Sequence, residues 1–177
     1  IEKAIDYYRQ ALLIDRLVYG EEHPKVAVDL NNQGLARLKL GETDTAISDF
    51  QQALSIWKNV YGEEHPNVAI GLNNLGMAQH ASGDIEKAID YYRKAHAIDR
   101  KVYDKEHPNI ANGLSNLGAA CIEAGYTEEA KGYLEKAYKI FIDIFGPLHP
   151  NTKTVKEWLD VCFSILEIDQ SEKDFDK

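Results

Sequence analysis

The chain has 177 residues, of which 44% are hydrophobic and 28% are charged, and its formal net charge is -9. This acidic balance argues against nucleic acid and anionic membrane surfaces as partners, because both are bound by clustered Lys and Arg side chains. The sequence also lacks the roughly 20 consecutive apolar residues of a membrane-spanning helix and the pattern of a signal or transit peptide, so we expect a cytoplasmic protein.

The N-terminal segment nearly duplicates a later part of the same chain. Residues 1–10 read IEKAIDYYRQ, and residues 85–94 read IEKAIDYYRK. In the later copy these residues fall in the second helix of a repeated unit. We therefore expect residues 1–24 to be the second helix of a truncated repeat, with a helix from Ile1 to Tyr19, and the chain to be a fragment of a longer array.

One dipeptide recurs along the chain at a fixed interval of 42 residues. It is His-Pro, at His23-Pro24, His65-Pro66, His107-Pro108 and His149-Pro150. A segment of the type Leu-Asn-Asn-Leu-Gly follows the first three copies in one register, and a second glycine follows that segment at a common offset. A constant period of this length indicates stacked supersecondary units. We expect full repeats at residues 25–66, 67–108 and 109–150.

Each repeat is predicted to contain two helices. The first begins near the proline, which suits the first turn of a helix because its missing N–H would be unpaired there, and it ends before the glycine. In the second helix of the first full repeat, one apolar stripe at helical spacing is formed by Ala46, Phe50, Ala53, Ile56 and Val60. The predicted hairpins cover residues 25–61, 67–103 and 109–145.

The last segment predicts a capping helix at residues 151–168. Large apolar side chains there are expected to cover the last hairpin, namely Trp158, Leu159, Phe163 and Leu166. The polar residues 169–177 are expected to form a disordered tail. The whole of residues 1–168 is expected to be a single repeat array.

Six histidines and two cysteines raise the question of a metal or catalytic site. Four of the histidines belong to the His-Pro dipeptides, and stacking separates such equivalent positions by roughly 8–10 Å per helix packing, whereas a zinc ion needs its ligands at about 2 Å. We interpret them as helix-start residues that bond exposed N–H groups. Cys121 and Cys162 lack the spacing of a zinc or redox motif and are expected to be buried thiols. We expect no catalytic residue, no metal and no cofactor, and hence no enzyme.

The pattern Leu-x-x-Leu-Gly, then Gly, then Ala-x-x-x-Tyr/Phe-x-x-Ala resembles the tetratricopeptide repeat. That repeat usually has a period of about 34 residues, and the longer period with His-Pro-x-Val/Ile-Ala is similar to the repeats of kinesin light chains and related bacterial proteins. The resemblance covers residues 1–150, with departures at Gln33, Arg37, Asp104 and Lys131. It implies an all-α fold, a right-handed superhelical solenoid of antiparallel helix pairs, with the first helices on a concave surface.

The implied concave surface carries repeated asparagines. Asn32, Asn74 and Asn116 occupy one register of successive first helices, and the register before it holds two asparagines and a serine. An amide both donates and accepts hydrogen bonds, and in the families that this chain resembles such asparagines hold the backbone of a ligand. Bonds within or between hairpins explain the same residues equally well, so both interpretations stay open. The candidate peptide-binding residues are Asn31, Asn32, Leu35, Lys39, Ile70, Asn73, Asn74, Met77, His80, Asn112, Ser115, Asn116 and Ile122.

These features predict a protein-interaction scaffold that binds a protein or peptide segment in its concave groove. Kinesin light chains receive tryptophan-containing acidic peptides in a basic groove, but here Lys39 aligns with Ala81 and Glu123, so we do not assign that ligand. Two alternatives stay open. The repeats are either the sensor or regulatory arm of a larger enzyme, with an ATPase or protease domain outside this segment, or a module for self-association through the terminal repeats.

Overall fold

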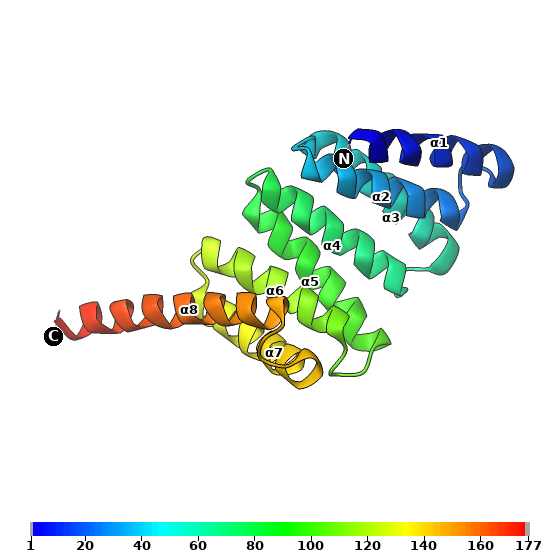
Figure 1. Ribbon diagram of the computed structural model, residues 1–177. Coiled ribbons are helices and arrows are strands. Elements are labelled where there is room, and N and C mark those ends of the chain that lie inside the picture. Colours follow the sequence, from blue (N-terminus) through cyan, green and yellow to red (C-terminus); the bar gives the residue numbers. More distant parts are fainter. Residues whose placement is uncertain (1, 176–177) are drawn as a thin grey trace. The chain divides into compact units, whose positions relative to one another are not determined.

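The computed structural model describes residues 2–175, with side chains described for residue 3 and for residues 5–168. Within these residues all regular secondary structure is helical (Figure 1), which confirms the all-α prediction. In chain order the helices are α1 (Glu2–Tyr19), α2 (Pro24–Lys39), α3 (Thr43–Tyr61), α4 (Pro66–Ala81), α5 (Ile85–Val102), α6 (Pro108–Glu123), α7 (Thr127–Phe145) and α8 (Pro150–Phe175).

The chain forms two compact units, Ile1–Val102 and Tyr103–Lys177. In the first unit, α1 packs on α2, α2 on α3, α3 on α4 and α4 on α5. In the second unit, α6 packs on α7 and α7 on α8, while α6 also touches α8. Each unit is therefore built by packing consecutive helices, as expected for stacked helical hairpins.

The histidine of each His-Pro dipeptide caps the first helix that follows it. Its Nδ1 atom accepts a hydrogen bond from the backbone N–H two residues later, at 3.1 to 3.2 Å. This bond satisfies an amide that has no partner inside the helix, as the sequence predicted. Each imidazole also stacks on an aromatic ring four residues earlier, with centroids 4.0 to 4.6 Å apart, in the pairs Tyr19–His23, Tyr61–His65, Tyr103–His107 and Phe145–His149.

A glycine of each first helix allows close approach of the second helix in the same hairpin. A Cβ atom at these glycines would lie only 2.5 to 2.6 Å from the facing side chain, in the pairs Gly34–Phe50, Gly76–Tyr92 and Gly118–Leu134. No real Cβ atom fits at such distances, so the glycine of the Leu-x-x-Leu-Gly pattern is required by packing. The facing side chains are fully buried. The predicted apolar stripe of α3 is core from Ala46 to Ile56, whereas Val60 at its end is 46% exposed, so its assignment to the core was wrong.

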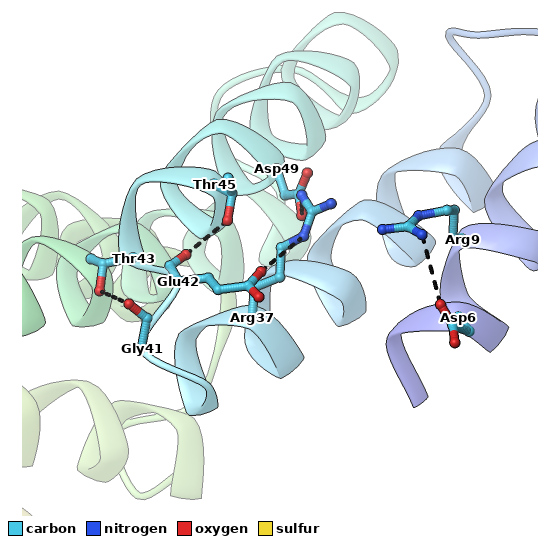
Figure 2. Close-up of polar contacts among 8 residues, drawn as sticks. All are labelled: Asp6, Arg9, Arg37, Gly41, Glu42, Thr43, Thr45 and Asp49. Carbon is cyan, nitrogen blue, oxygen red and sulfur yellow. Dashed lines mark hydrogen bonds and ion pairs between the residues drawn. The ribbon is translucent and has the colours of Figure 1, made fainter. Parts of the chain in front are cut away.

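One departure from the repeat pattern produces a buried ion pair. Arg37 Nη1 on α2 lies 2.7 Å from Asp49 Oδ2 on α3, and the Asp49 side chain is only 7% exposed. Figure 2 shows the two side chains meeting, with Glu42 on the other side of the guanidinium. Burial raises the pKa of Asp49, although Arg37 beside it acts in the opposite direction. The next repeat holds Gln79 and Tyr91 in these two registers.

A second departure shortens a helix. Asp104 stands where Gly62 and Gly146 end α3 and α7 with φ angles of 81° and 79°. No residue other than glycine has a positive φ in the described chain, because a Cβ atom makes that region costly. The helix before Asp104 is α5, and it ends at Val102, one residue earlier in the repeat than α3 and α7 end.

The capping helix α8 differs from the prediction in two ways. The buried residues of α8 are Thr152, Val155, Leu159 and Cys162, whereas Trp158 is only half-buried and Phe163 is 42% exposed. The helix also continues to Phe175, beyond the predicted end at residue 168, so the expected disordered tail is wrong for the backbone through that residue. The reason is that no glycine or proline follows Ile168, and the polar residues there are compatible with a helix. Residues 176 and 177 lie outside the described part.

Two further expectations concern the cysteines and the membrane. Cys121 and Cys162 are both buried and neither forms a disulfide, as predicted, and burial raises the pKa of the Cys162 thiol. Among the described helices, none combines the length and the apolar character needed to cross a membrane.

Candidate functional site

Each first helix of a hairpin carries accessible residues in the same registers. On α2 these residues are spaced four, three and four apart, namely Val28, Asn32, Leu35 and Lys39, all of which are half-buried or exposed. The spacing places them along one side of a helix, while the opposite side carries the buried residues of the hairpin. The same registers hold Ile70, Asn74, Met77 and Ala81 on α4, and Asn112, Asn116, Ala119 and Glu123 on α6. We call these residues the first-helix face.

In the first unit this face is mainly apolar. The exposed fractions of Val28, Ile70 and Met77 are 44%, 40% and 38%, and Leu35 is half-buried. Lys39 adds an exposed positive charge at the end of α2. Exposed apolar side chains that line up on neighbouring helices are typical of interaction surfaces.

Two of the predicted asparagines bond to each other across two first helices. Asn74 Nδ2 donates a hydrogen bond to Asn31 Oδ1 at 2.6 Å, and both side chains are 8% exposed. The bond joins α4 to α2. It pairs Asn74, in the register of Asn32, with Asn31, which lies one position earlier in the repeat. For this pair the structural interpretation of the asparagines is therefore realised, although each amide keeps one further polar group.

The other predicted residues of α2 and α4 differ in accessibility. Asn32, Asn73 and His80 are half-buried. The Oδ1 atom of Asn73 is buried and has no hydrogen-bond partner within the described residues. A buried carbonyl oxygen without a partner is costly, but this atom is not accessible to a ligand in the described structure.

In the second unit the predicted residues line a pocket. Asn112, Ser115 and Asn116 of α6 face Asn151, Thr154, Val155 and Trp158 of α8 across a cavity of about 150 Å³, with Phe141 of α7 also in its wall. Ser115 is buried and its hydroxyl donates to the carbonyl of Ala111 at 2.8 Å. This hydroxyl proton is therefore not available to a ligand, and Ser115 mainly shapes the wall of the pocket. Ile122 is half-buried on the same helix and does not line this pocket.

The sequence analysis missed the α8 side of this pocket. Trp158 lies one repeat length after Asn116 and therefore occupies the asparagine register of α8, yet it was assigned to the buried cap because of its size. The signal that was available is the register itself, because Trp158 stands in the column of Asn32 and Asn116, which are both half-buried. Asn151 and Thr154 occupy the same face of α8 by helical spacing.

The ionisable groups of the described residues do not assemble a metal site. No group of three or more His, Cys, Asp or Glu side chains in this part of the chain is placed to hold a metal ion. Burial raises the pKa of Asp99 on α5 to about 6. Asp99 lies outside the first-helix face and replaces the Trp57 and Phe141 of the adjacent repeats.

The recurring hairpin, the glycine contact inside it and the accessible first-helix face together define a helical repeat protein of the interaction-scaffold class. The chain belongs to the tetratricopeptide repeat family, because the family model for that repeat matches residues 1–52, 29–101 and 82–143. A search of curated proteins finds no match.

Solved structures agree with this assignment. A kinesin-light-chain-like protein of Podosopora anserina with nearly identical TPR-like repeats is 21% identical, with a TM-score of 0.78 over 98% of this chain and 82% of that one. BtubC (BKLC) from P. vanneervenii is 28% identical, with a TM-score of 0.74 over 84% of this chain and 59% of that protein. The apo form of RapI is 19% identical, with a TM-score of 0.79 over 93% of this chain and 57% of that protein. The predicted likeness to kinesin-light-chain-type repeats is confirmed at the level of the fold.

Proposed function

We propose that this chain binds an extended segment of a partner protein on its first-helix face. The observation that carries the proposal is the row of accessible apolar residues on α2 and α4, formed by Val28, Leu35, Ile70 and Met77. In the second unit Asn112, in the register of Val28 and Ile70, lines a pocket together with Asn116. Apolar side chains on a rigid surface provide contact area for ligand side chains. The amides can pair with a peptide backbone, which presents a donor and an acceptor at nearly every residue.

The charge of the chain supports a peptide over other ligands. Its net charge of -9 disfavours polyanions, and the first-helix face of the first unit carries Lys39 but no acidic residue. A neutral or mildly basic segment therefore meets the least electrostatic opposition from the chain as a whole.

The test compares two valines of nearly equal exposure. Val28 lies on the first-helix face and is 44% exposed, whereas Val60 lies near the end of the second helix α3 and is 46% exposed. A displayed library of random linear peptides is selected against the whole chain, and the enriched peptides are titrated against Val28→Asp and Val60→Asp. We expect binding to weaken at least about tenfold for Val28→Asp, because a charge replaces an apolar contact, and to be unchanged for Val60→Asp.

The outcomes of this experiment separate the first-helix face from other surfaces. Equal weakening by the two variants would reject the proposed face, and loss caused only by Val60→Asp would move the site to the second helices. A selection that enriches no peptide at all would reject linear-segment recognition. Circular dichroism melting of both variants is run in parallel, because neither substitution removes a buried contact and both are expected to melt like the original chain.

A second candidate function, self-association, is favoured by the surface of α1. Leu13, Ile14, Leu17 and Val18 are 61%, 58%, 79% and 64% exposed, whereas the residue in the register of Ile14 is 6% exposed in α3 and in α7. A second copy of α1 would cover this surface in a two-fold contact. The helix α8 of another copy fits less well, because Asp160 stands in the register of the close-packing glycines Gly34, Gly76 and Gly118.

Light scattering tests self-association with a matched pair of leucines. Leu17 on α1 and Leu148 between α7 and α8 are each 79% exposed. A dimer that dissociates with Leu17→Glu but persists with Leu148→Glu supports the α1 contact. If the original chain is monomeric at every concentration measured, self-association is rejected. The role of a regulatory arm in a larger enzyme stays a prediction, since no feature of the described residues favours it.

A further inference from the structure

We propose that the pocket between α6 and α8 selects one uncharged aromatic side chain of the bound segment. This inference rests on the proposed function and names the ligand group that a single place on the first-helix face takes. The pocket is formed within the second unit by α6, α7 and α8, so its shape depends on one packed body.

The size of the pocket sets the size of the group. Its volume is about 150 Å³, and a cavity of roughly this volume in a protein holds a benzene-sized molecule. The wall residues Phe141 and Val155 are each 1% exposed, so the deep part of the pocket is a fixed apolar surface. A phenyl ring fits such a space.

The lining selects against charge. The eight lining residues are three asparagines, one serine, one threonine and three apolar or aromatic residues, and none of them is ionisable. A carboxylate or ammonium group that entered the pocket would lose water and find no opposite charge, which is strongly unfavourable. The side-chain amides of Asn112, Asn116 and Asn151 instead suit the neutral peptide groups on either side of the inserted residue.

Trp158 favours an aromatic group over an aliphatic one. It is half-buried and lines the pocket from α8, while the first-helix face of α2, α4 and α6 presents asparagine in the same register. An asparagine in this register can form hydrogen bonds with a ligand, whereas the indole of Trp158 can pack against a ring. Aromatic pairs gain more than their buried area alone would give, so the pocket is expected to distinguish a phenyl ring from a saturated ring of similar size.

The probes are three blocked tripeptides, acetyl-Ala-X-Ala-amide, in which X is Phe, cyclohexylalanine or Glu. They are titrated into the uniformly ¹⁵N-labelled whole chain and followed by amide and indole signals in nuclear magnetic resonance. We expect millimolar binding of the Phe peptide, about two- to tenfold weaker binding of the cyclohexylalanine peptide, and no measurable binding of the Glu peptide. The shifts should appear at the Trp158 indole and the side-chain amides of Asn112, Asn116 and Asn151. The indole of Trp57, which is 2% exposed in the other unit, is the internal control.

Two variants on the same helix test the role of Trp158. Trp158→Leu removes the ring from the pocket wall, and Phe163→Leu removes an aromatic ring that is 42% exposed and does not line the pocket. Binding of the Phe peptide should be lost with the first variant and kept with the second. Equal affinity of the Phe and Glu peptides, shifts that avoid the pocket residues, or binding that survives Trp158→Leu would each overturn the proposal. A Trp158→Leu chain that is not folded is replaced by Trp158→Phe, for which reduced affinity of the Phe peptide is expected.

The failure of this inference and the failure of the proposed function give different results. If the tripeptides do not bind but longer selected peptides bind and lose affinity with Val28→Asp, the first-helix face stands and the aromatic pocket is rejected. If no selected peptide responds to Val28→Asp while the Phe tripeptide still shifts the pocket signals, the pocket stands and the extended binding mode is rejected.

Discussion

The Nδ2 atom of Asn74 lies 2.6 Å from the Oδ1 atom of Asn31, and this hydrogen bond joins α4 to α2 inside the first unit. Because both amides are buried, we expect this bond to stabilise the folded chain in the absence of a ligand. Asn116, in the register of Asn74, is only half-buried and lines the pocket of the second unit. Asn74 and Asn116 thus lie in different environments in the two units, although they occupy the same position of the repeat.

The first prediction separates these two environments. Asn74→Ala leaves the Asn31 carbonyl buried without its donor, so we expect a loss of about 1–3 kcal/mol in the free energy of unfolding. Asn116→Ala should change stability by about 0.5 kcal/mol or less, because this side chain is partly accessible to water. Denaturant unfolding of both variants is the measurement. Equal effects of the two substitutions would show that burial of the Asn31–Asn74 pair does not matter.

The second prediction concerns the glycine of the hairpin contact. Gly76→Ala places a Cβ atom 2.5 Å from the ring of Tyr92, which is 1% exposed and has no room to move. The resulting overpacking should cost about 1–3 kcal/mol. Gly132 in α7 has nothing within 4 Å of such an atom, so Gly132→Ala should instead stabilise the chain by about 0.5–1 kcal/mol through helix propensity. Thermal melting that moves in the same direction for both variants would contradict this account.

The third prediction concerns the dependence of stability on pH. Burial raises the pKa of Asp99 to about 6, from 3.8 for an ordinary aspartate. Because the folded pKa is the higher one, the stabilising effect of the protonated form is fully present below the unfolded pKa and is lost as the pH rises through the folded pKa. Asp99→Asn cannot lose a proton, so at neutral pH it should be more stable than the original chain by about 2–3 kcal/mol.

This advantage of Asp99→Asn should shrink steadily as the pH is lowered from about 7 to about 4. Unfolding free energies of the two chains, measured side by side across this range, isolate the contribution of Asp99, because the other carboxyl groups are common to both. A difference that does not vary with pH would mean that the carboxyl group of Asp99 titrates normally.

The fourth prediction uses the buried ion pair between Arg37 and Asp49. Arg37→Gln removes the guanidinium and leaves a carboxylate whose side chain is 7% exposed, which should cost about 3 kcal/mol. The double variant Arg37→Gln with Asp49→Tyr reproduces the residues at Gln79 and Tyr91 in the next repeat. It should recover most of the lost stability, since the unpaired charge is gone. If the double variant is no more stable than Arg37→Gln, the loss comes from packing and not from the stranded carboxylate.

The fifth prediction tests which residues of α8 form the cap. Leu159 is 7% exposed and Phe163 is 42% exposed. Leu159→Ala should therefore cost about 2–5 kcal/mol, whereas Phe163→Ala should cost about 1 kcal/mol or less, with part of that from the Lys131 ammonium that lies 5.1 Å from the ring centroid. The measurement is the melting temperature of each variant, and we expect it to fall further for Leu159→Ala than for Phe163→Ala, although leucine is the smaller residue.

The sequence by itself determined the elements of this protein and their order. The interval between the His-Pro dipeptides, the prolines at the helix starts and the glycines after the helix ends are local signals, because they act on the conformation of the residues that carry them. The same is true of the histidine caps. For this reason the hairpins at α2–α3, α4–α5 and α6–α7 were predicted almost to the residue, and the tetratricopeptide family was recognised from them.

Only the tertiary structure decided what each repeated position contacts. The partner of Asn74 is Asn31 in another repeat and another register, and no local pattern specifies that offset. Trp158 was assigned to the buried cap by its hydrophobicity, but packing of α8 on α7 buries Val155 and Leu159 and leaves the indole beside a pocket. Burial depends on how neighbouring helices meet, which is a property of the assembled fold, so residues that are equivalent in the repeat acquire different roles in space.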